Sequence, residues 1–417
     1  EDGNGAADLG DTWSRPATGR IRVCTRACGG RSPVLEDRYV AVFGGGLDAE
    51  HKRSPVLEGP DRDGGDDLYR PFGGNFLYMA DLATGQILYK RRMDRLEGLS
   101  VSQAESPAMV PSEPAAVDLD QDSYLDTIYV GTTDGYLYKV DLSTPQEIDP
   151  ASGRVTSPAW EPFRIFDTGG RPVYYPPSVV FVARLGRYAL AFGTGDREDL
   201  WSRSGQAGRF YLFLDTGFGP ATAGLPFDAS ELEPIHPTAT PTPAGADFLL
   251  APDTAAGKRP GWVMTLEADQ RVIDRAFALA GLLFFTTFDP DPSIGATGEC
   301  GSSGASSLFA VYIDSAGGVL PSGRFRTVSD LVTRPFAEPS LGAGGAPPPP
   351  GEPTAPSAPC DSAAMDAITR TLKSDLFPEE CDFAHHTLNV LALRSESGLE
   401  CLAPVPICVV RRNWKER

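Results

Sequence analysis

The sequence predicts an all-β protein, a β-propeller with long loop insertions, on three observations. Glycine (45) and proline (38) make up about a fifth of the 417 residues, and so many turn formers favour short strands over long helices. Hydrophobic residues amount to 41%, which is enough to bury a sizeable core. A unit made of one strand and one turn also recurs along the chain.

Short apolar runs bounded by Gly, Pro, Asn or Asp indicate where the strands lie. The clearest runs are Tyr39–Gly44, Asp126–Gly131, Ser178–Ala183, Tyr188–Gly193 and Leu282–Phe288. Helical periodicity is almost confined to Ser362–Leu376, where apolar residues recur at steps of three and four. We therefore expect many strands and one helix.

The recurring unit is a strand of large apolar residues that ends on an aspartate and a turn of small residues. Its copies are Gly74–Gly85, Asp134–Pro145 and, more loosely, Gly208–Gly217 and Ser306–Gly318. The aspartates are Asp81, Asp141, Asp215 and Asp314, and we expect each carboxylate to accept hydrogen bonds from the backbone of its turn. Outer strand, glycine turn, inner strand and aspartate turn are typical of a propeller blade. A β-sandwich with coincidental turns is the alternative.

Composition divides the chain into three expected parts. Residues 1–340 form the propeller body, which includes an acidic loop at 118–126 and insertions at 51–69 and 233–246. Residues 341–359 contain four consecutive prolines and form a linker or loop. Residues 360–417 form a cysteine-containing tail that completes the propeller.

The charge balance limits the partners of the chain. Acidic residues number 56 against 37 basic ones, a net charge of −19, which disfavours nucleic-acid binding and attracts cations. The longest apolar stretch, Phe277–Phe288, falls short of the roughly 18 residues that span a bilayer. We expect a protein that neither binds nucleic acid nor spans a membrane.

The seven cysteines predict disulfides and therefore an exported protein. None forms a CxxC pair, and four lie in the tail, at Cys360, Cys381, Cys401 and Cys408. Short spacings favour Cys24 with Cys28 and Cys401 with Cys408, while Cys300, Cys360 and Cys381 compete for a further bridge. Because the sequence starts at Glu1 and not at methionine, we expect a processed form.

The segment DLDQDSYLD predicts a calcium site. Its carboxylates stand at relative positions 1, 3, 5 and 9, and alternate residues of a tight loop point inward, toward an ion that prefers six to eight oxygens. Four carboxylates this close repel one another unless a cation lies among them. The expected ligands are Asp118, Asp120, Asp122, the Tyr124 carbonyl and Asp126. A solvated acidic turn is the alternative.

Two features qualify this loop. Position 6, where such loops prefer a glycine with positive φ, is Ser123, at a cost on the order of 1 kcal/mol. A strand follows the loop, so it is not an EF-hand. Weaker acidic segments are Asp2–Asp8, which matches part of the same spacing, and Asp61–Asp67, which matches no ligand template.

The chain resembles the C-terminal domain of the PilY family, type IV pilus biogenesis factors and tip-associated adhesins. The resemblance lies in the acidic loop that runs directly into a strand and in several segments that match in order. These are Gly10–Pro16, Ala189–Leu200, Gly261–Ile273, Phe284–Tyr312 and the final NWKER. Asp120 stands where asparagine is frequent in the family, and the chain has no Arg-Gly-Asp tripeptide.

The resemblance implies a modified seven-bladed β-propeller that holds one calcium ion in the acidic loop. It implies a non-enzymatic protein that supports pilus biogenesis, control of retraction, twitching motility and adhesion. Minor pilins of the pilus tip complex and a host or abiotic surface would be its partners. Its location would be the pilus tip, the cell surface, the outer membrane or the periplasm of a Gram-negative bacterium.

Two other functions remain open from the sequence. An integrin-like FG-GAP propeller would bind calcium through several complete loops, and this chain has one. A quinone-dependent dehydrogenase would need regularly spaced tryptophans, and only five are present. No catalytic or cofactor-binding residues are expected, because HExxH, GxSxG and phosphate-loop motifs are absent and Gly193–Asp196 is a turn.

Overall fold

The computed structural model describes most of the predicted body and three strands near and within the tail. The described residues are 9–12, 14–48, 57–58, 68–69, 73–93, 108–149, 151–155, 160–198, 200–201, 203–215, 217, 225–238, 245–279, 281–290, 304–320, 322–328, 336–339, 387–394 and 398–406. The chain divides into two compact units. The first comprises Glu1–Val179, Leu190–Glu198 and Leu214–Leu232, and the second Val180–Ala189, Asp199–Phe213 and Glu233–Arg417.

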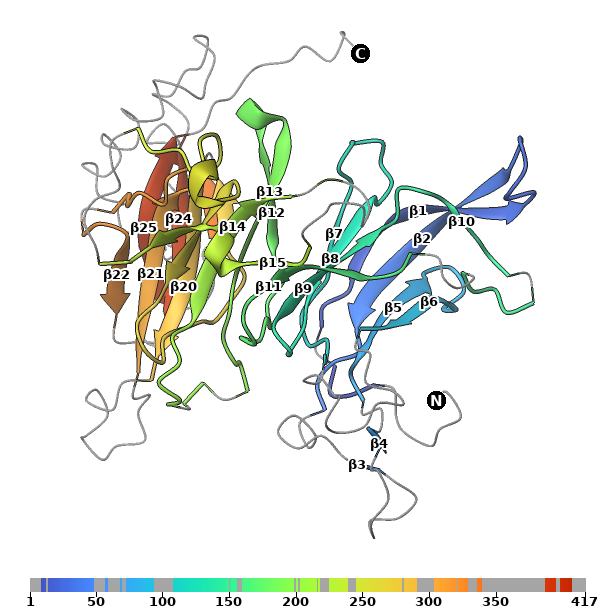
Figure 1. Ribbon diagram of the computed structural model, residues 1–417, viewed down its shortest axis with the longest axis horizontal. Coiled ribbons are helices and arrows are strands. Elements are labelled where there is room, and N and C mark those ends of the chain that lie inside the picture. The colour runs from blue at the N-terminus through green and yellow to red at the C-terminus, as the bar shows by residue number, and fades with distance from the viewer. Residues whose placement is uncertain are drawn as a thin grey trace, which may run out of the picture. The chain divides into compact units, whose positions relative to one another are not determined.

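The first unit contains two five-stranded sheets (Figure 1). One has the order β10-β1-β2-β5-β6, formed by β1 (Ala17–Arg26), β2 (Val34–Gly44), β5 (Phe76–Asp81), β6 (Ile87–Arg92) and β10 (Gln146–Glu147). The other has the order β15-β11-β9-β8-β7, formed by β7 (Ala115–Val117), β8 (Thr127–Gly131), β9 (Tyr136–Asp141), β11 (Phe163–Asp167) and β15 (Phe227–Asp228). The short strands β3 (Leu57–Glu58) and β4 (Leu68–Tyr69) pair with each other.

Later residues form three more sheets. The order β12-β13-β14-β17-β16 joins β12 (Ser178–Val182), β13 (Arg187–Gly193), β14 (Arg209–Leu214), β16 (Glu233–Ile235) and β17 (Gly261–Thr265). The next has the order β18-β20-β21-β22, with β19 also on β20; its strands are β18 (Arg271–Val272), β19 (Phe277–Leu279), β20 (Leu282–Asp289), β21 (Ala305–Tyr312) and β22 (Phe325–Val328). The last contains β23 (Phe336–Pro339), β24 (Thr387–Arg394) and β25 (Gly398–Pro406).

The helices of the described residues are three single 3-10 turns. They are η2 (Ala183–Leu185), η3 (Ala229–Glu231) and η4 (Thr254–Ala256). None of the helices in this part of the chain has the length and hydropathy needed to cross a membrane. The expected helix at Ser362–Leu376 lies outside the described residues.

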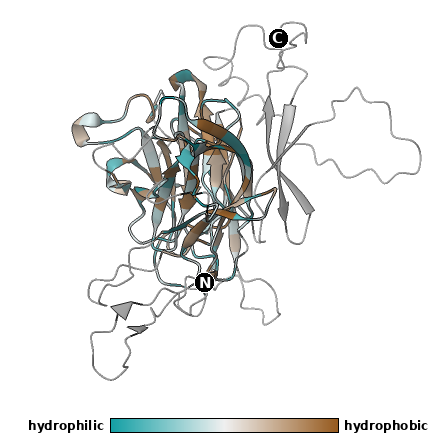
Figure 2. Cartoon of the chain, turned by 90° about the vertical axis from the view of Figure 1, so that its right-hand side faces the viewer, coloured by the Kyte–Doolittle hydropathy of each residue, from teal (hydrophilic) through white to brown (hydrophobic). Residues whose placement is uncertain are grey.

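The prediction of an all-β fold is confirmed. Each of the five expected strands is present, within β2, β8, β12, β13 and β20. The four copies of the repeated unit supply β5, β9, β14 and β21, and three of these pair antiparallel with the strand expected before them, in β2–β5, β8–β9 and β20–β21. In Figure 2 the hydrophobic residues, in brown, lie mostly on strands. The number of seven blades and the boundaries at 340 and 359 stay predictions.

Both sheets of the first unit are closed at one edge by a short parallel strand from later in the chain. Val23 on β1 pairs with Gln146 on β10, and Phe166 on β11 pairs with Phe227 on β15. Each closing strand has only two residues. The edge strands β1 and β11 are thereby covered at these positions.

The turn aspartates behave as predicted in three of four copies. Asp81 accepts hydrogen bonds from the N–H groups of Ala83 (2.8 Å) and Thr84 (3.0 Å). In the same way, Asp141 accepts from Ser143 (2.9 Å) and Asp215 from Gly217 (3.2 Å). The fourth copy differs: the Gly317 N–H donates to the Ser315 hydroxyl (3.4 Å), and Asp314 lies 3.7 Å from the Arg184 guanidinium. In this copy the serine hydroxyl accepts the backbone hydrogen bond of the turn that an aspartate carboxylate accepts in the other three.

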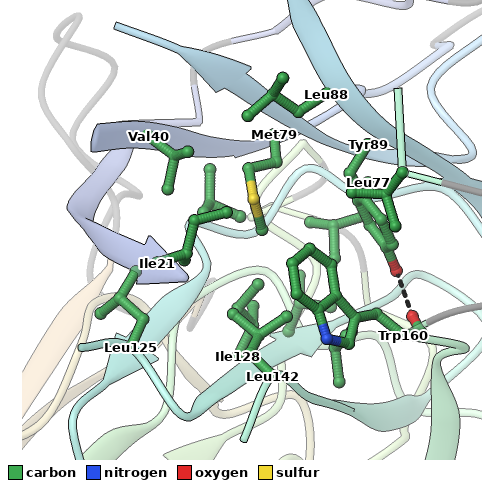
Figure 3. Packing of buried hydrophobic residues seen from close by; sticks show 14 of the residues in the cluster. Ile21, Val40, Leu77, Met79, Leu88, Tyr89, Leu125, Ile128, Leu142 and Trp160 are labelled. Atoms are coloured by element: carbon green, nitrogen blue, oxygen red, sulfur yellow. Dashed lines mark hydrogen bonds between the residues drawn. The ribbon is translucent and has the colours of Figure 1, made fainter. Parts of the chain in front are cut away.

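The core of the first unit lies between its two sheets (Figure 3). Met79 and Leu88 of the first sheet face Ile128 and neighbouring residues of the second. The Tyr89 hydroxyl donates a 2.8 Å hydrogen bond to the Trp160 carbonyl, so this buried phenol is satisfied. Leu125, at the end of the acidic loop, belongs to the same core, which ties the loop to the packing of both sheets.

One predicted disulfide is present in the described residues. Cys24, near the end of β1, is bonded to Cys28 in the turn that leads to β2. The other predicted pairings involve Cys300, Cys360, Cys381 and Cys408, which lie outside the described residues, and Cys401, of which only the backbone is described. The disulfide closes the tip of the β1–β2 hairpin.

A buried ion pair joins β9 to the turn after β14. Lys139 has no exposed side-chain surface, and its ammonium lies 2.7 Å from the Asp215 carboxylate, which is 6% exposed. The same ammonium donates to the Gly217 carbonyl and lies 5.2 Å from the centre of the Tyr129 ring. The Lys139 ammonium therefore bonds both a carboxylate and a carbonyl of a turn that begins 76 residues later in the sequence.

We expect Lys139→Met to destabilise the chain by about 3–5 kcal/mol, because it leaves the Asp215 carboxylate buried without its lysine. The measurement is urea-induced unfolding followed by tryptophan fluorescence. The double variant Lys139→Met/Asp215→Leu should recover much of the loss, since neither charge then remains buried. A double variant as unstable as the single one would contradict this account.

Candidate metal centre

The acidic loop is the nine-residue connection between the antiparallel strands β7 and β8. Its base is closed where the Asp126 N–H donates to the Val117 carbonyl (2.9 Å). The Asp126 carbonyl in turn accepts from the Leu142 N–H (2.7 Å), just after β9. Both ends of the loop are thus fixed to the sheet.

The carboxylates of the loop bind its own backbone. Asp118 accepts from the N–H groups of Gln121 (2.6 Å) and Ser123 (2.8 Å). Asp126 accepts from those of Leu119 (2.7 Å) and Asp120 (3.2 Å). These bonds wind the chain tightly, because each aspartate satisfies donors that a loop without regular structure would leave to water.

The winding forces two residues into the left-handed region. Gln121 has φ of 66° and Ser123 has φ of 75°. Position 6 of the loop therefore has the positive φ that the spacing predicts, although it is occupied by serine. A residue with a Cβ pays roughly 1–2 kcal/mol in this conformation relative to the right-handed one.

Three of the predicted carboxylates converge. Oxygens of Asp118, Asp120 and Asp126 all lie within 4.8 Å of one another, which is the largest separation that two ligands of one ion at about 2.4 Å can have. Asp122 is outside this group, and its carboxylate accepts from the Tyr124 N–H (2.8 Å). The roles of Asp122 and of the Tyr124 carbonyl as ligands stay predictions.

The electrostatics of the site favour a cation. Asp126 is only 7% exposed, and this burial raises the pKa of its carboxyl, as do the charges of Asp120 and Asp118, against the lowering effect of the Leu119 and Asp120 N–H groups. Among the described residues, none of the four loop carboxylates forms an ion pair with a basic side chain. The donor set is made of hard oxygens, which suit calcium or magnesium better than a transition metal.

Residues from the β1–β2 hairpin complete the surroundings of the loop. The Tyr124 hydroxyl donates to Asp37 (2.9 Å), and its ring lies beneath the guanidinium groups of Arg20 (4.1 Å) and Arg22 (3.9 Å). Sequence reasoning missed these three residues. No local pattern could have identified them, since 87 residues separate Asp37 from Tyr124.

The other sequence candidates do not add to the site. Asp2–Asp8 and Asp61–Asp67 lie outside the described residues. Gly193 is the last residue of β13, and the segment that follows it has no regular structure: the Gly195 N–H donates to the Pro172 carbonyl (3.1 Å) and Asp196 accepts from the Glu198 N–H (2.9 Å). In the described part of the chain, the acidic loop is the one cluster of three or more carboxylate, imidazole or thiol groups that can hold a metal.

Comparison with known proteins returns structures but no sequence relatives. No family model and no curated protein matches the chain. The chain is similar to the crystal structure of the Pseudomonas aeruginosa PilY1 C-terminal domain, with 15% identity and a TM-score of 0.48 over 78% of this chain and 69% of that one. It is also similar to BamB from Moraxella catarrhalis, with 13% identity and a TM-score of 0.24 over 71% and 73%. The first match is to the family that the sequence resembles. At TM-scores below 0.5, neither match carries an assignment of function.

We expect Ser123→Gly to raise the free energy of unfolding of the metal-free chain by about 0.5–1 kcal/mol. Glycine removes the free-energy cost that serine has at positive φ. This gain is larger than the loss of stability that glycine causes by making the unfolded chain more flexible. Urea unfolding in the presence of a chelator measures the change. Ser143→Gly is the matched control, because Ser143 lies in an exposed turn without positive φ and should gain nothing. Equal effects of both substitutions would contradict the assigned strain.

Proposed function

We propose that the chain is a calcium-binding β-propeller module of a type IV pilus tip protein, without enzymatic activity. It would be exported to the pilus tip, cell surface, outer membrane or periplasm of a Gram-negative bacterium. It would contact minor pilins of the tip complex and a host or abiotic surface, and support pilus biogenesis, retraction control, twitching motility and adhesion. The acidic loop supports calcium binding, and the sequence resemblance to the PilY family supports the pilus role.

The convergence of Asp118, Asp120 and Asp126 is the observation that carries the proposal. These carboxylates come from a loop whose ends are fixed to strands, so bringing them together needs little reorganisation. When bound, calcium supplies the positive charge that offsets their mutual repulsion. Asp118, Asp120 and Asp126 would hold the ion, and Asp122 and the Tyr124 carbonyl would complete its shell after a small movement of the loop.

Calcium binding should stabilise the fold, because the unfolded chain cannot assemble these ligands. At a calcium concentration a hundredfold above Kd, we expect about 2.7 kcal/mol of added stability. Calorimetric titration of the chelator-treated chain should show one site, and thermal unfolding should shift upward with calcium. More than one equivalent of calcium would favour the integrin-like propeller with several loops.

The ligand assignment is tested with charge-removing variants of similar shape. Asp118→Asn and Asp126→Asn should weaken calcium binding at least tenfold, since each removes one of three converging charges. Asp149→Asn is the matched control, because Asp149 caps an exposed turn of the same unit, through the Ala151 N–H (3.1 Å), outside the loop. Loss of binding in the control, or none in the loop variants, would refute the assignment.

The pilus role is tested in the bacterium that produces the protein. Asp126→Asn at the chromosomal locus should reduce surface pili and twitching motility while the amount of protein stays the same. Asp149→Asn should leave both unchanged. Normal piliation in a variant that no longer binds calcium would refute calcium control of the pilus, and it would leave calcium binding and the pilus role as independent properties.

A further inference from the structure

We infer that the side chain of Tyr124 couples the acidic loop to the β1–β2 hairpin, so that cation binding in the loop orders the hairpin. The inference rests on the proposed calcium site and adds the element that responds to it. Tyr124 is a positioning residue here: its side chain acts on the hairpin, whereas only its backbone carbonyl is a candidate ligand.

The Tyr124 side chain contacts three residues of the hairpin. Its hydroxyl lies 2.9 Å and 3.1 Å from the two carboxylate oxygens of Asp37. The guanidinium carbons of Arg20 and Arg22 lie 4.1 Å and 3.9 Å from the ring centre. Arg22 and Asp37 are register partners on β1 and β2, so one side chain contacts both strands of the hairpin at once.

The two residues that flank Tyr124, Ser123 and Leu125, contact β1. The Leu125 N–H donates to the Arg20 carbonyl (2.7 Å), and the Arg20 side chain donates to the Ser123 carbonyl (3.4 Å). Leu125 also packs against Gly19, where a Cβ would come within 2.6 Å of the leucine side chain. Three consecutive loop residues, Ser123–Leu125, therefore form a continuous contact with β1.

These contacts lie inside the segment that the carboxylates define. Ser123–Leu125 stand between Asp122 and Asp126, and the Tyr124 N–H is bound by Asp122 (2.8 Å). Drawing the carboxylates around one ion restricts the backbone on both sides of Tyr124. The ring and hydroxyl would then be presented to Arg20, Arg22 and Asp37 in one orientation instead of several.

The outer half of β2 is held by β1, by the Cys24–Cys28 disulfide at the tip of the hairpin and by the ion pairs of Asp37 with Arg20 (3.6 Å) and Arg22 (3.9 Å). β5 pairs with β2 only along Val40–Gly44, so in the described part of the chain the segment Val34–Tyr39 has β1 as its ladder partner. β10 covers β1 only at Val23 and Cys24. Opening of this half should therefore need less free energy than opening of the sheet interior, and contacts through Tyr124 should change it measurably.

Hydrogen exchange measured by mass spectrometry, with and without calcium, tests the coupling in the whole chain. Calcium should slow exchange across residues 34–39 about tenfold in the unaltered chain. Tyr124→Ala, measured at a calcium concentration that calorimetry shows to be saturating for that variant, should lose this protection. Tyr124→Phe keeps the ring against the two arginines and loses the bond to Asp37, so it should retain part of the protection.

Tyr39→Ala is the matched control, because Tyr39 lies on the same hairpin, is 60% exposed and is the register partner of Arg20. It should keep both calcium binding and protection. Calcium binding without any change of exchange at 34–39, or full protection in Tyr124→Ala, would overturn the coupling and leave the calcium site intact. Absence of calcium binding in the unaltered chain would overturn both the site and the coupling.

Discussion

The buried carboxylate of Asp126 is the constraint on which the rest of the first unit depends. Its backbone closes the β7–β8 connection and bonds to the residue after β9, while its side chain bonds the start of the loop. A carboxylate at this depth must be satisfied by donors or by a cation. The N–H groups of Leu119 and Asp120 do part of this, and in doing so they bring Asp118 and Asp120 close to Asp126. The convergence of the three carboxylates thus follows from the satisfaction of one buried charge.

The same chemistry recurs at several turns, and its outcome depends on how many carboxylates meet. At Asp141 the aspartate accepts from its turn, and at the buried Asp81 the Arg38 guanidinium also lies 3.6 Å from the carboxylate. At Asp215 the aspartate is buried, and Lys139 supplies the counter-charge from a distant strand. In the acidic loop three carboxylates converge, while the nearby Arg20 and Arg22 guanidinium groups lie on the Tyr124 ring. Lys139 offsets the buried charge of Asp215, and a bound cation would do the same for the acidic loop under our proposal.

Sequence reasoning succeeded where the determinants are local. The apolar runs identified the strands, and the alternate aspartates identified the loop and the positive φ of Ser123, because turn and strand signals span a few residues. It failed where distant segments meet. Nothing near Tyr124 indicates Asp37, and nothing near Lys139 indicates Asp215. Asp122 lies outside the converging group, and its role as a ligand stays a prediction.

The parallel closing strands make the units inseparable by a single cut in the chain. A fragment that stopped at Asp141 would keep β1 but lose β10, and one that stopped at Asp167 would keep β11 but lose β15. Each would present an uncovered strand edge, a template for aggregation. A fragment long enough to retain β15 already carries Val180–Ala189 and Asp199–Phe213, which belong to the other unit. To express either unit alone, its three separate segments would therefore have to be joined to one another, because truncation at a single position cannot isolate them.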